Sequence, residues 1–305
     1  MFFKYLVQNY ENYTIAVLFF VCQCNISAFY PYYCSQILII MRAKSIRIPA
    51  LIVCMALFSC SFGKTIRRGN GNIVTREFQV SQFDEIELCL PATVNYRTGS
   101  RYSCVVKVDE NLLDYLSINT VDGDLELNKV KKHRSVNLQA TQFVIEITSP
   151  SLKGIDIAGS GDVYVLNSLT GKEMSVNIAG SGDVIFKEPI VMTEFDAEIA
   201  GSGDVKITKH SEFQKIDVEI AGSGDVVFSD ANVLKVDVEI AGSGDVTVNG
   251  QIRNAEIESA GSGDVYLGEV VGSLQYGIVG SGDIYYSGSP TVRGSKMGSG
   301  DIHKR

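Results

Sequence analysis

The feature of this sequence that most constrains its fold is the motif Gly-Ser-Gly-Asp, which occurs eight times between residues 159 and 301. Successive copies are 21, 21, 21, 20, 19, 19 and 18 residues apart. Such a repeat predicts that each copy is one structural unit, stacked on the units before and after it. The aspartates of the eight copies, called the Asp column below, are Asp162, Asp183, Asp204, Asp225, Asp245, Asp264, Asp283 and Asp301.

The residues before each motif alternate between apolar and charged side chains. In the fourth copy, Ile216, Val218 and Ile220 alternate with Asp217 and Glu219, and the next copy repeats this pattern. A period of two is typical of a β-strand with one buried face. Each copy is therefore expected to contain at least one half-buried strand.

A unit of 18–21 residues is too short to bury an apolar face alone, but stacked copies bury it between them. Residues 151–305 therefore predict an all-β fold, a right-handed single-stranded parallel β-helix with 18–21 residues in each rung. A propeller blade would need about 40 residues, and a leucine-rich repeat would show its own Leu and Asn pattern. Neither pattern occurs here.

Residues 65–150 have the composition of strands but lack the full motif. Residues 121–125 resemble a degenerate copy, because Asp124 lies 38 residues, about two repeats, before Asp162. This region is expected to form irregular first rungs of the same β-helix. It would also cap the N-terminal edge, since an open strand edge promotes aggregation.

The sequence from Met41 resembles an export signal. Arg42, Lys44 and Arg47 precede a short apolar run, which is too short to span a bilayer. Residues 41–60 are therefore predicted to be a signal peptide.

The predicted signal peptide ends in a lipobox-like Leu-Phe-Ser-Cys, which makes Cys60 a candidate for lipidation; cleavage after Gly63 is the alternative. Residues 1–40 are interpreted as an upstream or unstructured segment, with a transmembrane anchor as the alternative. Either route takes the protein out of the cytoplasm, to the cell envelope. An outer-membrane lipoprotein that faces the periplasm or the surface is the expectation.

Charge and cysteine content exclude several functions. The first 60 residues contain four basic residues and one acidic residue, which leaves 23 basic and 34 acidic residues in the rest. An acidic body of this kind repels nucleic acid, so no nucleic-acid partner is expected. Cys89 and Cys104 are the only cysteines beyond residue 60, and strand alternation places them on opposite faces, which argues against a disulfide.

The Asp column is the sharpest candidate for chemistry. Stacking places its carboxylates about 4.8 Å apart, a spacing at which like charges repel. Hydrogen bonds from backbone N–H groups or Ser hydroxyls of the same turn would offset that repulsion. The alternative is a row of oxygen ligands for Ca²⁺. We expect turn formation, without a firmly predicted metal site or cofactor.

Other residue types give weaker signals. The serines of the motif lack a partnered His, so no nucleophile and no catalytic residue is predicted. His133, His210 and His303 have no metal-ligand or triad spacing. Four tyrosines could offer rings for sugar stacking, although Tyr is also common in strands. They are Tyr164, Tyr266, Tyr285 and Tyr286.

Residues 83–86, 112–113, 122–125 and the Ala-Gly-Ser-Gly-Asp-Val copies from Ala158 onward resemble the family called putative auto-transporter adhesin, head GIN domain. The resemblance covers about residues 75–303. The last two copies replace the Ala and the Val by other apolar residues. The resemblance implies a β-helical fold, a place in the envelope of Bacteroidetes and a role in adhesion. It implies no catalytic residues.

These observations favour a non-catalytic envelope protein for binding or adhesion. Its partners would be an unidentified glycan or surface protein, and a lipid anchor would hold it to a membrane. The alternative is a β-helix polysaccharide lyase or hydrolase. Such an enzyme would need a break in the repeat with clustered acids and a basic residue, and fold alone does not supply that function.

Overall fold

The computed structural model describes residues 8–10, 13–15 and 65–305, in two units, Met1–Ala50 and Leu51–Arg305. In the first unit, β1 (Gln8–Tyr10) and β2 (Tyr13–Ile15) form an antiparallel pair. The predicted signal peptide and Cys60 lie outside the described residues. No helix among the described residues is long and apolar enough to cross a bilayer.

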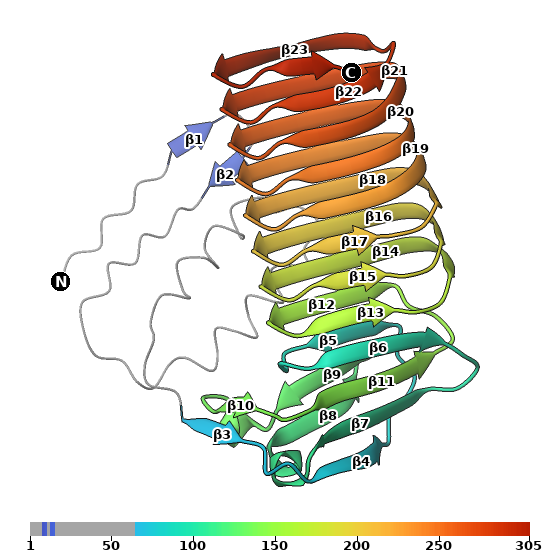
Figure 1. Ribbon diagram of the computed structural model, residues 1–305, viewed down its shortest axis with the longest axis vertical. Helices are drawn as coiled ribbons and strands as arrows, with labels where there is room; N and C mark the ends of the chain where they lie inside the picture. The colour runs from blue at the N-terminus through green and yellow to red at the C-terminus, as the bar shows by residue number, and fades with distance from the viewer. Residues whose placement is uncertain (1–7, 11–12, 16–64) are drawn as a thin grey trace, which may run out of the picture. The chain divides into compact units, whose positions relative to one another are not determined.

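The repeats form a β-solenoid of about seven stacked turns, which we call coils (Figure 1). Every strand pair from β12 onward is parallel, which confirms the predicted all-β parallel β-helix. In the first coils a long strand ends at the motif and a short strand follows it. The long strands are β12 (Gly154–Gly159), β14 (Leu169–Gly180), β16 (Ile190–Gly201) and β18 (Ser211–Gly222), and the short ones are β13 (Asp162–Val165), β15 (Val184–Phe186) and β17 (Val205–Ile207).

In the later coils the short strand runs on into the next long strand. These strands are β19 (Val226–Gly242), β20 (Val246–Gly261) and β21 (Val265–Gly280), followed by β22 (Ile284–Gly288), β23 (Thr291–Gly298) and β24 (Ile302–Lys304). The shrinking period is absorbed by register shifts between Phe228 and Ala231 and again between Val248 and Gln251. The motif itself stays in register throughout.

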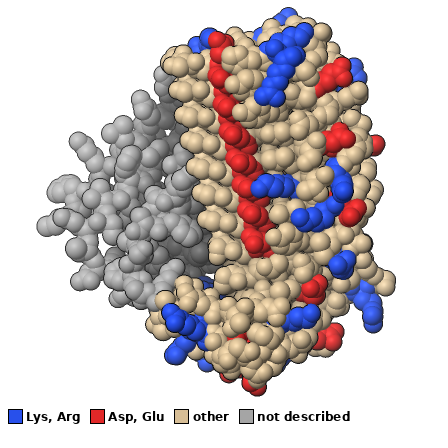
Figure 2. All heavy atoms as spheres, viewed as in Figure 1, with Lys and Arg blue, Asp and Glu red and all other residues tan. Residues whose placement is uncertain are grey.

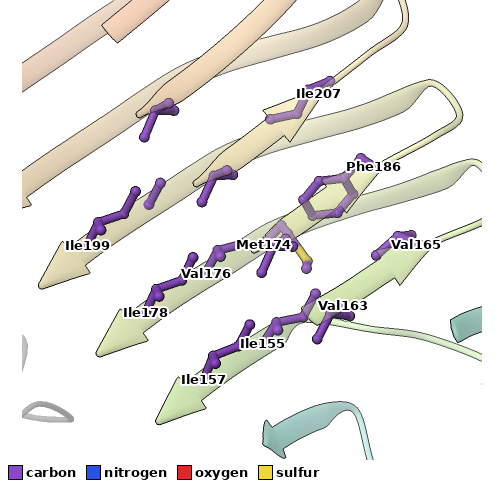
Figure 3. Packing of buried hydrophobic residues seen from close by; sticks show 14 of the residues in the cluster. Ile155, Ile157, Val163, Val165, Met174, Val176, Ile178, Phe186, Ile199 and Ile207 are labelled. Carbon is purple, nitrogen blue, oxygen red and sulfur yellow. The ribbon is translucent and has the colours of Figure 1, made fainter. Parts of the chain in front are cut away.

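Alternation fills the interior with apolar ladders. Ile155 and Ile157 stack on Val176 and Ile178 of the next coil, as Figure 3 shows. Larger rings pack further along, where Phe195 contacts the rings of Phe186, Phe213 and Phe228 edge-on at centroid distances of 5.4–5.8 Å. Burying each Val, Ile or Phe side chain contributes about 1.5–3 kcal/mol, and this burial holds the coils together.

Residues 65–150 combine two kinds of pairing. β5, β6, β9 and β11 extend the parallel ladders of the repeats, whereas β4 with β7, β7 with β11 and β8 with β9 pair antiparallel. The elements are β3 (Ile66–Arg68), β4 (Ile73–Phe78), β5 (Glu85–Leu88), β6 (Thr93–Thr98), β7 (Ser103–Asp109), β8 (Leu116–Val121), β9 (Asp124–Lys129), β10 (Asn137–Gln139) and β11 (Phe143–Ser149), with 3-10 helices at Glu110–Tyr115 and Lys131–His133.

The interpretation of residues 121–125 as a degenerate motif is wrong. Asp124 pairs through Glu85 with Gly154, whereas Asp162 pairs with Thr93, so Asp124 belongs to a different ladder. Residues 122 and 123 instead form the two-residue turn of the β8–β9 hairpin, with positive φ angles of 54° and 99°. Asp-Gly is favoured at such turns because both positions require positive φ.

The two described cysteines are free thiols. Cys104 is buried in β7, and burial raises the pKa of its thiol to about 12. Cys89 is half-buried after β5, with its Sγ 3.4 Å from Oε1 of Glu87. Each thiol therefore has its own surroundings, one apolar and one polar.

Candidate functional site

The Asp column forms a straight line along the solenoid. Each of its residues follows the turn after a long strand, at or just before the short strand that comes next. Seven of the carboxylates are half-buried, and Asp301, in the last coil, is exposed. Figure 2 shows an unbroken acidic line along the stacked coils, as this register requires.

Each carboxylate in the column binds the next coil. The backbone N–H of every column residue from Asp183 to Asp301 donates to Oδ1 of the aspartate one coil earlier, at 2.7–3.1 Å. The backbone carbonyl of Asp183 meanwhile accepts from the N–H of Val163 in the preceding coil. The side chain thus supplies an acceptor at the turn, where the coils would otherwise lose a link.

This arrangement corrects the prediction of hydrogen bonds within one turn. The donor to each Oδ1 lies about 20 residues away in sequence, in the neighbouring coil. Asp301 is the exception, because its Oδ1 accepts from the N–H of Ile302 beside it. Sequence spacing alone could not distinguish the two cases, since both place a donor one short contact from the carboxylate.

The second oxygen, Oδ2, is bonded where a donor stands two residues further along the chain. Nζ of Lys206 lies 2.7 Å from Asp204, and the hydroxyl of Tyr266 lies 3.0 Å from Asp264. Position 185, two residues after Asp183, is an Ile, which has no group to donate. Sequence reasoning missed these partners, although strand alternation places a residue and its second neighbour on the same face.

The end of the column has the densest contacts. Oδ2 of Asp283 lies 3.1 Å from the Tyr285 hydroxyl and 3.3 Å from Nε2 of His303. The N–H of Asp301 lowers the pKa of Asp283 most, and Tyr285 and His303 add to this effect. Lys296 lowers the pKa of Asp301 through a 2.9 Å contact. Hydrogen-bond donors therefore favour the ionised form and offset the repulsion within the column.

The contacts of the column bear on the calcium alternative. Seven of the eight Oδ1 atoms accept an N–H from the next coil and the eighth accepts one from its neighbour, so these oxygens are already engaged. Across the described part of the chain, no group of three or more His, Cys, Asp or Glu side chains is arranged to hold a metal ion. The geometry fits a link between coils and gives no Ca²⁺ cage.

The candidate tyrosines mostly use their ring faces on each other. Tyr266 stacks on Tyr285 with centroids 5.0 Å apart, and Tyr285 stacks on His303 at 4.9 Å. The Arg305 guanidinium lies over both tyrosine rings. Tyr164 carries the Lys187 ammonium 5.3 Å from its centroid. These contacts close much of the ring surface that sugar stacking would need.

Basic residues also link the outward acids of neighbouring coils. Lys215 contacts Asp217 at 2.7 Å and Asp237 at 3.6 Å, and Lys235 contacts Asp237 at 2.8 Å and Glu256 at 3.5 Å. Although burial acts to lower it, the bond to Asp217 and the surrounding carboxylates raise the pKa of Lys215. These acids therefore form part of an ion-pair network along the axis, an arrangement that needs no catalytic pair to explain it.

The histidines and motif serines have separate places. His133 packs against the ring of Tyr115 at 4.4 Å, and Nδ1 of His210 lies 3.0 Å from Oδ2 of Asp230. The motif serines are exposed, and the N–H of Ser202 donates to Gly180 of the preceding coil. The structure does not bring a histidine and a motif serine together into a nucleophilic pair in any contact of the described residues.

Comparison with known proteins places this geometry in a family. The family described as "Putative auto-transporter adhesin, head GIN domain" matches residues 82–251 and 196–304. A solved structure described as a putative lipid binding protein from Parabacteroides distasonis ATCC 8503 is 30% identical, with a TM-score of 0.63 over 79% of this chain and 100% of that chain. No curated protein matches the chain.

Two solved structures described as putative adhesins share the fold. One, also from Parabacteroides distasonis ATCC 8503, is 25% identical, with a TM-score of 0.69 over 79% of this chain and 100% of that chain. The other, from Parabacteroides merdae ATCC 43184, is 22% identical, with a TM-score of 0.67 over 79% and 99%. The resemblance derived from the repeats is confirmed, and the chain belongs to the family described as putative auto-transporter adhesin, head GIN domain.

Proposed function

We propose that this protein is a non-catalytic adhesion protein of the cell envelope, which presents a rigid solenoid to a glycan or a surface protein. The observation that carries the proposal is the column of side-chain-to-backbone bonds between coils. The acids that recur in every coil act as links between coils, so the most regular chemistry of the chain maintains a stiff, repetitive surface. A stack of equal units offers the same side chains at regular intervals, which suits attachment to extended ligands.

Family membership supports this role, since the family and two of the solved relatives are described as adhesins. One relative is described as lipid-binding. A lipid chain would need an apolar cavity, and the interior here is filled by side chains such as Phe195 and Phe228, both fully buried. We therefore favour a ligand bound on the outer surface.

Attachment to the cell would come from a lipid on Cys60. Labelling of growing cells with a radioactive fatty acid should mark the wild-type protein and leave Cys60→Ser unmarked. Label on the Cys60→Ser protein would show that the anchor is elsewhere. Absence of label on both proteins, when a known lipoprotein in the same cells is marked, would overturn the anchor.

Binding is tested with beads that carry the full chain, passed under flow over surfaces coated with mucin glycans, glycosaminoglycans or extracellular-matrix proteins. We expect saturable retention on at least one surface, with no soluble sugar product released. Beads that carry heat-denatured protein serve as the control. Equal retention of native and denatured beads on every surface, or release of product sugars at the rate of a glycosidase, would overturn the proposal.

A further inference from the structure

A shallow groove of about 650 Å³ crosses β18, β19, β20 and β21 at the corner where the repeat period shortens. Ligand sites in proteins commonly have volumes of about 300–1,000 Å³, an apolar lining and a few polar groups. Here the buried side chains of Phe213, Val233 and Ile252 contribute to the lining. The groove thus has the size and composition of a small-ligand site, although it is open to solvent.

The repeat is broken at this groove. Ile252 pairs with Val270 and Asn254 with Ser273, so Arg253 of β20 stands opposite two residues of β21, at positions 271 and 272. Such a bulge redirects side chains, and bulges are common beside functional sites. The break therefore separates this corner from the uniform surface of the other coils.

The polar rim has one cation. Arg253 is the only basic residue lining the groove, its side chain is exposed, and it has no ion-pair partner in the part of the chain that the structure describes. A guanidinium group binds a carboxylate through two parallel hydrogen bonds. An unpaired Arg253 in a concave surface therefore favours a ligand with one carboxylate near β20.

The amides of the rim extend from Arg253 along the axis. Gln251 is on the same strand as Arg253, and Asn232 pairs with Gln251 in the preceding coil, about 4.8 Å away. Each amide offers both donors and acceptors, which is the combination that sugar hydroxyls need. Glu212 pairs with Asn232 one coil further on, so the rim is acidic about two coils from Arg253.

Two apolar side chains are exposed in the same groove. Leu234 is 53% exposed and Val271 is 56% exposed, values high enough that neither belongs to the core. Side chains of this kind can pack against the C–H face of a sugar ring, while the rim binds its hydroxyls. Cation, amides and apolar contacts thus converge on one concave surface.

We propose that this groove binds the end of a glycan that carries a single carboxylate, such as a sialylated oligosaccharide. Arg253 binds the carboxylate, Asn232 and Gln251 bind hydroxyls of the following neutral sugars, and Leu234 and Val271 contact a ring. Glu212 disfavours a second carboxylate two coils away, because like charges repel. The inference rests on the proposed adhesion function and specifies its ligand.

The test is titration of the full chain with 3′-sialyllactose, lactose and a polygalacturonate oligomer. We expect binding of sialyllactose, with at least 10-fold weaker binding of the other two. Arg253→Gln should weaken sialyllactose binding about 10- to 100-fold, because it removes a charged hydrogen-bond pair. Arg253→Lys should keep part of the affinity, and the matched control Arg134→Gln, which removes an exposed Arg of the N-terminal region, should keep all of it.

The two proposals fail in different ways. Unfolding temperatures and circular dichroism spectra of the variants must match the wild type, so that any loss of affinity reports on the groove. If the wild-type chain binds a surface in the bead assay but ignores sialyllactose, or if Arg253→Gln binds it as tightly as wild type, the groove proposal is overturned and adhesion stands. If native beads bind no surface and sialyllactose does not bind, both proposals fail.

Discussion

The repeats and the N-terminal region use buried or half-buried carboxylates in contrasting ways. In the repeats, one aspartate per coil accepts one N–H from the next coil, and the same bond recurs along the stack. In the N-terminal region a single aspartate, Asp109, is fully buried and accepts the N–H groups of Gly71 and Thr141, both at 2.7 Å. It joins two loops that no other copy of the sequence can replace.

This difference teaches how repetition distributes stability. A solenoid is held by contacts between neighbours, so the loss of one column bond affects one pair of coils. The irregular region depends on individual side chains with several partners. We therefore expect substitutions to have local effects in the column and wider effects at Asp109, with close backbone packing more sensitive than either.

The largest effect is expected from Gly203→Ala, in the third motif. A Cβ at this position would overlap the carbonyl oxygen of Gly182 in the preceding coil and crowd Ile178. Overpacking against backbone that cannot move costs about 3 kcal/mol of unfolding free energy. Urea unfolding of the variant measures this loss.

Gly277→Ala is the matched control, because a Cβ there has no neighbour within 4 Å. This variant should unfold within about 0.5 kcal/mol of wild type, since Ala in a compatible strand position reduces the freedom of the unfolded chain. Equal losses in the two variants would show that close coil-to-coil contact at the motif is not what restricts Gly203.

Asp109→Asn should rank second, because an amide nitrogen would face an N–H donor in place of one carboxylate oxygen. Burial alone would raise the pKa of Asp109, but the N–H groups of Gly71 and Thr141 outweigh it and lower the pKa. A lowered folded-state pKa stabilises the fold above the unfolded value of about 3.9, and this stabilisation is lost as pH falls through the folded value. The stability gap between wild type and variant should narrow as the pH falls below about 4.

Hydrogen exchange locates this effect. The Gly71 and Thr141 amides should lose protection in Asp109→Asn, while amides of the repeats keep theirs. A constant stability gap from neutral to acidic pH, with unchanged exchange at both amides, would contradict this role of Asp109.

Asp204→Ala should have a smaller effect, about 1 kcal/mol, because it leaves one half-buried N–H, that of Asp225, without its acceptor. Thermal unfolding measures the loss. Asp183→Ala, which affects the neighbouring pair of coils in the same way, should cost a similar amount. A loss several times larger for either variant would mean that the column is a cooperative unit and not a series of separate links.

Lys206→Ala should have the smallest effect, no more than about 0.5 kcal/mol. The bond to Asp204 raises the pKa of Lys206, but the side chain is 41% exposed, so solvent screens the pair. The difference from wild type should shrink further in high salt. A salt-independent loss above about 1 kcal/mol would show that Oδ2 matters as much as Oδ1.

Much of the repeat fold could be predicted from sequence because its signals repeat. The alternation around Ile216 and Val218, copied in each unit, determined the buried face and the parallel register. The N-terminal region gave one instance of each signal, and the Asp122-Gly123 turn was mistaken for a motif because its hairpin partner strand was not recognised. A single copy cannot show whether a Gly-Asp pair belongs to a coil or to a hairpin.

The candidate site was predictable in its residues but not in its partners. Sequence identified the aspartates as turn-forming, yet the donor to Asp204 is the backbone of Asp225, a choice that depends on the three-dimensional stacking of turns. The groove at Arg253 depends on a register shift between β20 and β21. The shortening of the period from 20 to 19 residues was its only signal in the sequence.

The most direct test of the account is amide hydrogen exchange at Asp225 in Asp204→Asn and Asp204→Ala, each with Ca²⁺ and with chelator. If Oδ1 links the coils, Asp204→Asn keeps an acceptor oxygen and the Asp225 amide stays protected, whereas Asp204→Ala loses that protection, and Ca²⁺ changes neither result. Equal protection in both variants would contradict the link. Protection and unfolding temperature that rise with Ca²⁺ in the wild type and not in Asp204→Asn would show instead that the column binds a cation.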